Sequence, residues 1–285
     1  MCVLFKTVPE DFYGRLDRFL RRYFPHIPQS ILEKGLRKGE VRLNKAKSKS
    51  NARVVPGDIV SYPPSFDVFL AVDHTRIKDP FLYEKFRSYI VYENEEFCVI
   101  NKPAGIASQG GSNVICDIDR MANSGHVTHF LVHRLDKGTS GLLLLAKNTI
   151  TANVFMHQFR ERKIQKYYLA YVERKPAQDS GIIDLPLYSA GESVCVNYQN
   201  GKNAITRYRV VGKVGEMVCL LLKPYTGRKH QIRVHLKEGL GLPIIGDEKY
   251  GAPPAKRLFL HAYQIKIPYG RGKTLTINSR YQDSI

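Results

Sequence analysis

The sequence predicts an α+β fold built from two domains, and three observations lead to this prediction. The chain of 285 residues carries a formal charge of +18, and residues 14–64 hold 12 basic against 4 acidic side chains. Within this basic region, apolar residues recur at helical spacing in two short segments. From residue 89 onward, extended apolar runs alternate with one clear helical pattern. We therefore expect a small basic domain followed by a larger domain of strands with few helices.

The basic region is predicted to begin with two amphipathic helices. In the first, apolar side chains recur between Phe12 and Tyr23 with arginines interleaved, and Pro25 ends the pattern. The second begins near Pro28 and ends at Gly39, which suits the left-handed backbone that often follows a helix. Short strands are expected at residues 41–44 and 59–62. The basic side chains assigned to the exposed faces are Arg15, Arg18, Arg22, Lys34, Arg37, Lys38 and Arg42.

The charge of the chain favours a polyanionic partner. Lys and Arg side chains that neutralise phosphates release condensed counterions, which drives binding to nucleic acid. An inert basic surface, or one that binds acidic lipid, would have the same composition. The longest apolar runs are six residues, far below the roughly 20 that cross a bilayer. With no convincing signal-peptide pattern, we expect a cytoplasmic protein without a membrane partner.

No metal site or cofactor is predicted from the sequence. The five cysteines are widely scattered, without the close pairs of a zinc site or the density of a disulfide scaffold. His126, His129 and His133 lie close together in the sequence, but no acidic or thiolate ligand accompanies them at a familiar metal spacing. We therefore expect reduced, mostly buried thiols and no metal site at these histidines.

The first stretch that could carry chemistry is VHRLDKGTSGLLLLAKN. Residues 142–146 form a continuous apolar run, typical of a strand buried on both faces, and polar side chains precede it. A carboxylate at the mouth of such a strand, here Asp136, could act as nucleophile or general base. Residues 136–138 could equally form an ordinary turn in which Asp136 bonds its own backbone. The residues alone leave both interpretations open.

Two further segments follow. A helix is expected at residues 149–162, and then an alternating strand at 164–172, where Lys166 and Tyr168 share one face; Tyr168 could stack on a base or be plain core. If Thr226 caps a helix that runs to about residue 237, cations crowd its first turn, where the helix dipole is already positive. A bound anion would relieve that conflict. A helix boundary displaced by a few residues would relieve it equally well.

Seven segments occur in a characteristic order: INKPAGIASQGGS, VHRLDKGTSGLLLLAK, KYYLAYV, NAITRYRVV, PYTGRKHQIRVHL, GLPIIGDEKYG and LFLHAYQIKIP. Together they resemble the RluA family of pseudouridine synthases, and most closely its RluC-like members, which act on the ribosomal large subunit. The order of basic helices and short strands near the N-terminus resembles the S4 RNA-binding domain. The resemblance implies an S4-like domain at residues 12–72, a linker at 73–88 and a catalytic domain with a mixed, mainly antiparallel sheet at 89–285.

The same resemblance implies roles for residues that match the family's motifs. Asp136, in HRLD, would be the catalytic nucleophile that attacks a flipped-out uridine, and Arg233, in HQIR, would pair with Asp136 and hold it ionised against the cost of burial. Tyr168 would lie against the base, and Arg134 would fill the gap that the base leaves. No metal or cofactor is implied. The residues expected to bind the substrate are Arg134, His133, Lys166, Arg228 and His230.

The sequence departs from the family pattern at three places. Gly138 stands where an acidic residue is usual, Lys229 stands where Thr is typical, and residues 108–112 replace a histidine-containing loop. We expect a monomeric enzyme that converts uridines of large-subunit (23S) rRNA to pseudouridine without an obligatory protein partner. A tRNA-directed synthase of the same family and a non-catalytic RNA-binding or ribosome-assembly protein remain as alternatives.

Overall fold

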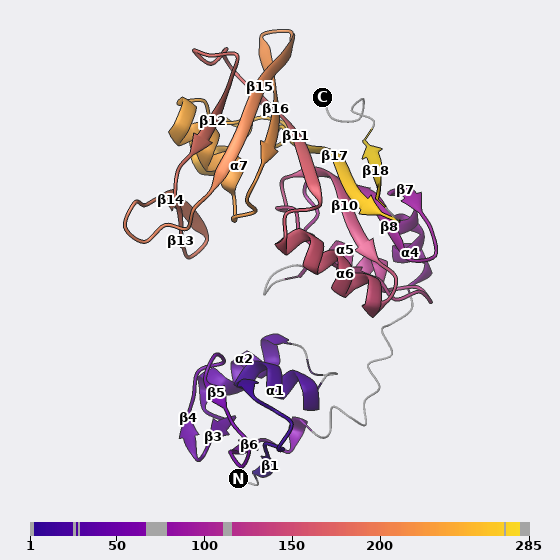
Figure 1. Cartoon of the computed structure of the whole chain (residues 1–285), viewed down its shortest axis with the longest axis vertical. Coiled ribbons are helices and arrows are strands. Elements are labelled where there is room, and N and C mark those ends of the chain that lie inside the picture. The colour runs from indigo at the N-terminus through magenta and orange to yellow at the C-terminus, as the bar shows by residue number, and fades with distance from the viewer. Residues whose placement is uncertain are drawn as a thin grey trace. The chain divides into compact units, whose positions relative to one another are not determined.

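The computed structural model describes residues 3–24, 27, 29–66, 79–110, 116–270 and 272–279. The chain divides into two compact units, Met1–Ile77 and Lys78–Ile285, which differ in size and in architecture (Figure 1). Each unit contains its own cluster of buried apolar side chains.

The first unit packs two helices against short strands. Helix α1 buries Leu16, Phe19 and Leu20 and keeps its arginines exposed, and α2 ends before Gly39, whose φ is +73°. The predicted helix pair is therefore confirmed. Four strands form a sheet in the order β1-β6-β3-β4, and β2 pairs with β5. The elements are β1 Leu4–Thr7, β2 Gly14–Arg15, α1 Leu16–Tyr23, α2 Gln29–Lys38, β3 Arg42–Leu43, β4 Ala46–Lys47, β5 Arg53–Val54 and β6 Ile59–Tyr62.

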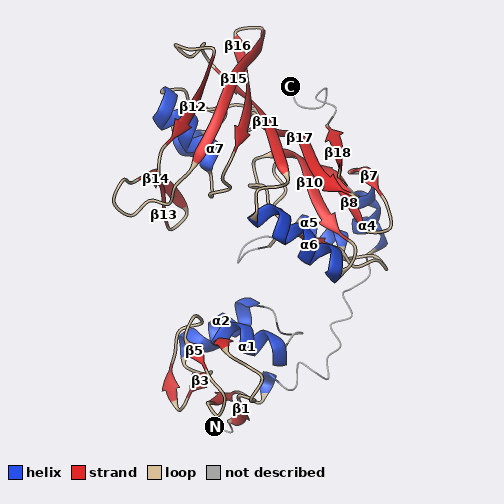
Figure 2. Cartoon of the chain, viewed as in Figure 1, coloured by secondary structure: helices blue, strands red, loops and turns tan. Residues whose placement is uncertain are grey.

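The second unit is built on one long, mixed sheet with helices packed against it (Figure 2). Its main path runs β12-β15-β16-β11-β17-β10-β8-β7, with β18 paired to β17 and β9 to β10. All of its pairs are antiparallel except β10 with β17. The strands are β7 Ile90–Glu93, β8 Phe97–Lys102, β9 Phe130–Leu131, β10 Ser140–Ala146, β11 Gln165–Val172, β12 Ser180–Asp184, β15 Ile205–Val214, β16 Met217–Pro224, β17 Leu260–Tyr269 and β18 Lys273–Asn278.

Strand β10 is buried along its whole length, as its apolar run predicts. Its alternate residues enter two different clusters: Leu143 and Leu145 pack with helix α5 (Ile118–Ala122), and Leu142 and Leu144 pack with helix α6 (Thr149–Arg160). Side chains alternate across a strand, so helices on both faces leave it no solvent-exposed side. The loop that precedes β10, which contains Asp136, is therefore attached to a rigid element.

The boundary between the expected linker and the second domain differs from the one expected. Pro80–Arg87 forms helix α4 inside the expected linker, and it packs beside α5 with Phe86 buried, so it belongs to the second unit. The rest of the expected linker, residues 73–78, lies outside the described residues. In α6, Val154 is 47% exposed and does not join Phe155 on the apolar face.

Smaller elements complete the second unit beside β11 and β16. A separate hairpin pairs β13 (Leu187–Ala190) with β14 (Ser193–Val196). Helix α7 spans only Gln231–Val234 and continues as a π-helical turn over His235–Gly239. A short 3₁₀ turn follows at Glu248–Tyr250. None of the helices in the described part of the chain is long and apolar enough to cross a membrane.

Candidate active site

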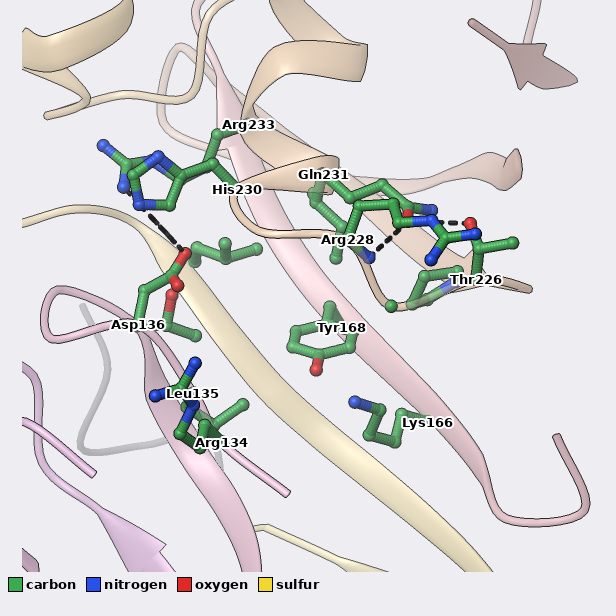
Figure 3. Close-up of a pocket in the computed structure, with 15 residues that line it drawn as sticks. Arg134, Leu135, Asp136, Lys166, Tyr168, Thr226, Arg228, His230, Gln231 and Arg233 are labelled. Atoms are coloured by element: carbon green, nitrogen blue, oxygen red, sulfur yellow. Dashed lines mark hydrogen bonds and ion pairs between the residues drawn. The ribbon is translucent and has the colours of Figure 1, made fainter. Parts of the chain in front are cut away.

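A pocket opens in the second unit where the loop before β10, strand β11 and the segment leading into α7 meet (Figure 3). It gathers residues from three of the segments singled out in the sequence, HRLD, K-x-Y and TGRKHQIR. Its lining combines basic and polar side chains with apolar ones. The lining residues are Arg134, Leu135, Asp136, Thr139, Lys166, Tyr168, Pro224, Thr226, Gly227, Arg228, His230, Gln231, Ile232, Arg233 and Leu260.

Asp136 lies in a tight turn, and its carboxylate faces cationic and polar groups across the pocket. The N–H of Thr139 donates to its backbone oxygen at 3.0 Å, as in an ordinary turn. Its Oδ2 lies 3.9 Å from Nη1 of Arg233 and 4.0 Å from Nε2 of His230. The two interpretations of this segment are therefore compatible, because the turn directs the carboxylate toward Arg233 (Figure 3).

The expectation that Arg233 holds Asp136 ionised requires correction. Arg233 makes its short contacts with Asp247, through Nε at 2.8 Å and Nη2 at 2.6 Å, and leaves Nη1 for Asp136. Burial raises the pKa of Asp136, and the charges of Arg233 and Lys102 oppose this without reversing it. The carboxylate of Asp247 is fully buried, so it competes strongly for the guanidinium.

The segment from residue 226 to 231 is held by the amide of Gln231. Its oxygen accepts from Thr226 Oγ1 at 2.7 Å and from the N–H of Arg228 at 3.0 Å. Its nitrogen donates to the Ile205 carbonyl oxygen and to Thr206 Oγ1, both at 3.0 Å. The amide oxygen thus accepts two hydrogen bonds and the amide nitrogen donates two, which is the full capacity of a Gln side chain. These four bonds fix the loop to β15.

The prediction that Thr226 caps a helix is wrong. The helix begins five residues later, at Gln231, and Thr226 instead joins Gln231 to the N–H of Ile205. The three predicted first-turn residues, Arg228, Lys229 and His230, therefore precede the helix. His230 has φ of +52°, a left-handed backbone conformation that is uncommon for a side chain of this size. The dipole conflict that suggested a bound anion is therefore absent from this turn.

Four of the five predicted substrate-binding residues line the pocket, namely Arg134, Lys166, Arg228 and His230. Arg228 donates from Nε to the Asn203 carbonyl oxygen at 3.1 Å. His133 is the exception. Its Nε2 accepts from the N–H of Leu144 at 3.0 Å, its ring packs on Phe159, and burial lowers its pKa well below the usual range. His133 therefore supports the backbone of β10 and does not itself line the pocket.

Tyr168 is both a core residue and a pocket residue. It is 6% exposed, belongs to the main apolar cluster of the second unit and lines the pocket. Lys166 lies two residues earlier, with Nζ 5.9 Å from the centre of the Tyr168 ring. Ile164, expected on the same face, precedes β11 and packs in the cluster under α6. Tyr168 can therefore be part of the core and still present one surface of its ring to the pocket.

Two supports of the Asp136 loop were not identified from the sequence. Ser108 donates to the Leu135 carbonyl oxygen at 2.8 Å and accepts from the Leu135 N–H at 3.0 Å. The buried Nζ of Lys102 donates to the carbonyl oxygens of Pro103 and Ile106, and more weakly to that of Lys137 at 3.4 Å. Burial lowers the pKa of Lys102 to about 7, and the charge of Asp136 opposes the shift.

The first unit contains a basic groove, which we call the N-terminal groove, with a volume of about 800 Å³. Of the seven cations predicted to bind RNA, Arg15 and Arg37 line this groove. Lys47 and Lys49 also line it and are not among the seven. Arg22 pairs with Asp11 at 2.6 Å, and Lys38 lies 3.7 Å from Glu40. Arg18, Lys34 and Arg42 are exposed elsewhere on the unit. The lining residues are Arg15, Glu33, Leu36, Arg37, Lys47, Ser48, Lys49, Ser50 and Asn51.

The pocket supplies a carboxylate, three guanidinium groups, an imidazole and a tyrosine ring. Within the described ranges, no group of three or more His, Cys, Asp or Glu side chains is placed to hold a metal ion. A carboxylate of raised pKa that faces N–H donors is suited to nucleophilic attack or to proton transfer. The arrangement therefore offers acid, base and nucleophilic chemistry from its own side chains.

Comparisons with known proteins identify the family. A family model described as RNA pseudouridylate synthase matches residues 96–238. A Rickettsia bellii protein named ribosomal large subunit pseudouridine synthase C is 38% identical over 277 residues, covering 92% of each chain. A Vibrio cholerae protein of the same name is 36% identical over 283 residues, covering 93% of this chain and 89% of the relative.

Solved structures agree with this assignment. The human RNA pseudouridylate synthase domain containing 4 superposes with a TM-score of 0.59 and 28% identity, over 70% of this chain and 91% of that chain. The human RNA pseudouridylate synthase domain containing 1 superposes with a TM-score of 0.57 and 27% identity, over 67% and 82%. By sequence over most of its length, and by the fold of its larger unit, the chain belongs to the RNA pseudouridylate synthase family.

Proposed function

We propose that this enzyme converts uridines of large-subunit rRNA to pseudouridine in the cytoplasm, acting as a monomer with Asp136 as its nucleophile. One observation carries the proposal for Asp136: its carboxylate opens into a basic pocket, 3.9 Å from Arg233 and beside Tyr168. The names of the relatives from Rickettsia and Vibrio support large-subunit rRNA as the substrate.

The reaction balances without a cofactor. The bond from the ribose C1′ to N1 of uracil breaks, the base rotates, and a bond from C1′ to C5 forms. The hydrogen on C5 is lost and N1 gains one, so the product is an isomer of the substrate. Asp136 would form a bond to the uridine as the bond from C1′ to N1 breaks, and this bond would break again as C1′ joins C5, which restores the free carboxylate. Tyr168 would lie against the flipped base. Arg134 would occupy the gap that the base leaves in the RNA, and Lys166, Arg228 and His230 would contact the flipped nucleotide.

We propose further that the first unit is an S4-like RNA-binding domain over residues 12–72. Two short basic helices that pack on small strands support this assignment, and the N-terminal groove offers several cations at one place. Cations clustered in a groove bind phosphates with little regard to sequence. In this proposal the first unit supplies affinity, and the pocket of the second unit selects and transforms one nucleotide.

The first prediction concerns the nucleophile. Asp136→Asn keeps the shape of the side chain but removes its charge, so pseudouridine formation should fall by at least about 10⁴-fold while RNA affinity stays within about twofold. Formation is measured by chemical adduct and primer extension on rRNA that lacks the modification. Asp184→Asn, at an exposed position on β12, is the control and should keep full activity. Full activity of Asp136→Asn would refute the role of Asp136.

The substrate is tested separately. Pseudouridines are mapped in total RNA from cells with and without the gene. Loss of a site in large-subunit rRNA supports the proposal. Loss of a tRNA site instead would assign the enzyme to tRNA, and no lost site would indicate a non-catalytic RNA-binding protein.

A further inference from the structure

The His230 ring is held between Tyr250 and Asp136. Its Nδ1 lies 2.7 Å from the Tyr250 hydroxyl, and its Nε2 lies 4.0 Å from Oδ2 of Asp136. Tyr250 is 6% exposed, and its hydroxyl accepts a hydrogen bond from the N–H of Val194 at 3.1 Å. Each ring nitrogen of His230 therefore faces one defined group.

The Tyr250 hydroxyl decides which nitrogen carries the proton. A phenol has one proton to donate, and here its oxygen already accepts from Val194. If Nδ1 of His230 carried a proton, the hydroxyl would receive two N–H donors, and its own proton would need a third partner in a buried site. If the hydroxyl donates to Nδ1 instead, both groups are satisfied. The hydrogen bond then leaves the imidazole proton on Nε2.

The surroundings of Nε2 favour the same tautomer. An N–H directed at a carboxylate is attracted to it, whereas a lone pair at 4.0 Å from Asp136 would be repelled. The doubly protonated ring is disfavoured first by burial, and next by the charges of Arg233, Lys229 and Lys249, with Asp247 opposing them. These effects lower the pKa of His230 to about 4, so the ring is neutral at pH 7.

The backbone of His230 is held as firmly as its ring. Its left-handed φ of +52° costs free energy, which the neighbouring contacts must offset. The Gln231 amide binds the chain on both sides of this position, through Thr226, the Arg228 N–H and β15. Functional sites commonly hold residues in such conformations because the surrounding contacts over-determine them.

We propose that Tyr250 is a positioning residue that fixes His230 as the neutral Nε2–H tautomer, so that this N–H and Nη1 of Arg233 together orient the carboxylate of Asp136. The inference rests on the proposed role of Asp136. A neutral donor orients a carboxylate without adding the second positive charge that would lower its reactivity. Because both donors stand about 4 Å away, Asp136 is oriented without being engaged in a short ion pair.

The tautomer can be measured directly. Long-range ¹⁵N–¹H NMR correlations of the full-length enzyme, labelled with ¹⁵N-histidine, separate the two neutral tautomers from the imidazolium. His230→Gln assigns the signal by its disappearance. We expect the wild type at pH 7 to show the Nε2–H form alone, and Tyr250→Phe to show a mixture of tautomers. Tyr208→Phe removes a buried hydroxyl in the core, away from His230, and should leave the signal unchanged.

Activity supplies a second readout. Tyr250→Phe should lower kcat about three- to tenfold, the effect of one hydrogen bond, with KM unchanged. Because the neutral ring loses its donor, the pKa of His230 should rise and a second group should appear in the acid limb of the pH profile. An Nδ1–H or imidazolium signal in the wild type, or a Tyr250→Phe variant with the wild-type signal and kcat, would refute the proposal. The NMR result needs no RNA, so it is independent of the Asp136→Asn test.

Discussion

The chemistry of Asp136 depends on how burial and nearby charge combine at one carboxylate. Its pKa is raised by burial, and three cations oppose the shift: Arg233, Lys102 and Lys229. Arg233 is shared with Asp247, which also raises the pKa of Asp136. Since a stronger ion pair would make the carboxylate a poorer nucleophile, the long contact with Arg233 leaves Asp136 more basic than an ordinary aspartate.

The pH dependence of the reaction should therefore report Asp136. We expect kcat/KM to fall as the pH drops through a pKa above the usual Asp value of about 3.9. Lys102→Met should move this acid limb to higher pH, because it removes a cation that lowers the pKa of Asp136. Because burial lowers the pKa of Lys102 to about 7, its ammonium is mostly charged below about pH 6, and the variant and the wild type are compared there. The measurement is a pH series of single-turnover rates on rRNA.

A remote lysine provides the control for Lys102. Lys213 has a side chain that is 62% exposed, on the β15–β16 hairpin. Lys213→Met removes the same charge without affecting the pocket, so its acid limb should coincide with that of the wild type. An acid limb that is unchanged in Lys102→Met would mean that the buried ammonium does not act on Asp136.

At the scale of elements, the site depends on how closely β10 approaches β17. These strands form the parallel pair of the sheet, with Gly141 opposite Ala262. Gly141 has φ of +109°, and a Cβ there would lie 2.4 Å from the Ala262 carbonyl oxygen. Only glycine suits both the backbone conformation and the space. The loop that contains Asp136 ends one residue before this pair.

Replacing this glycine should loosen the site and destabilise the second unit. We expect Gly141→Ala to lower the free energy of unfolding by at least about 2 kcal/mol, because backbone strain adds to a steric clash. Gly212→Ala is the matched control: Gly212 lies in β15, with open space around its Cα and no positive φ. Urea unfolding followed by far-UV circular dichroism measures both. Equal stability of the two variants would contradict the argument from close approach.

Some elements of the fold could be predicted because their signals are local. The buried run of β10, the spacing in α1 and Gly39 after α2 depend on neighbours in the sequence. Helix α4 was missed although Asp79 accepts from the Leu82 N–H and Pro80 stands at the first turn, which is a familiar start signal. It was missed because the surrounding prolines and acidic residues suggested a linker.

The contacts of the site could be predicted only in part. The motifs correctly gathered Asp136, Tyr168 and Arg233 at one pocket. The competition of Asp247 for Arg233, and the contact of Tyr250 with His230, depend on how the 3₁₀ turn packs against α7. Such partners lie 14 and 20 residues apart in the chain, and no spacing rule links them. The signal for the first contact lay in the GDEKYG segment, because a buried acid such as Asp247 needs a charged partner.

If the first unit binds RNA and the second carries the chemistry, as proposed, salt dependence should separate the two tasks. One variant replaces three cations of the N-terminal groove by Gln: Arg37, Lys47 and Lys49. The control replaces three other exposed cations of the first unit by Gln, none of which lines the groove or was predicted to bind RNA: Arg21, Lys45 and Arg53. If the groove binds phosphates, the first variant should reduce the slope of log affinity against log salt by about 2, and raise KM with kcat unchanged. The control variant should change both quantities far less, because its cations bind fewer phosphates, although the net charge lost is the same. Filter binding on rRNA from about 50 to 300 mM KCl measures the salt slope, and kinetics on the same RNA measure KM and kcat. Equal losses in the two variants would show that net charge, and not the groove, governs RNA binding by the first unit.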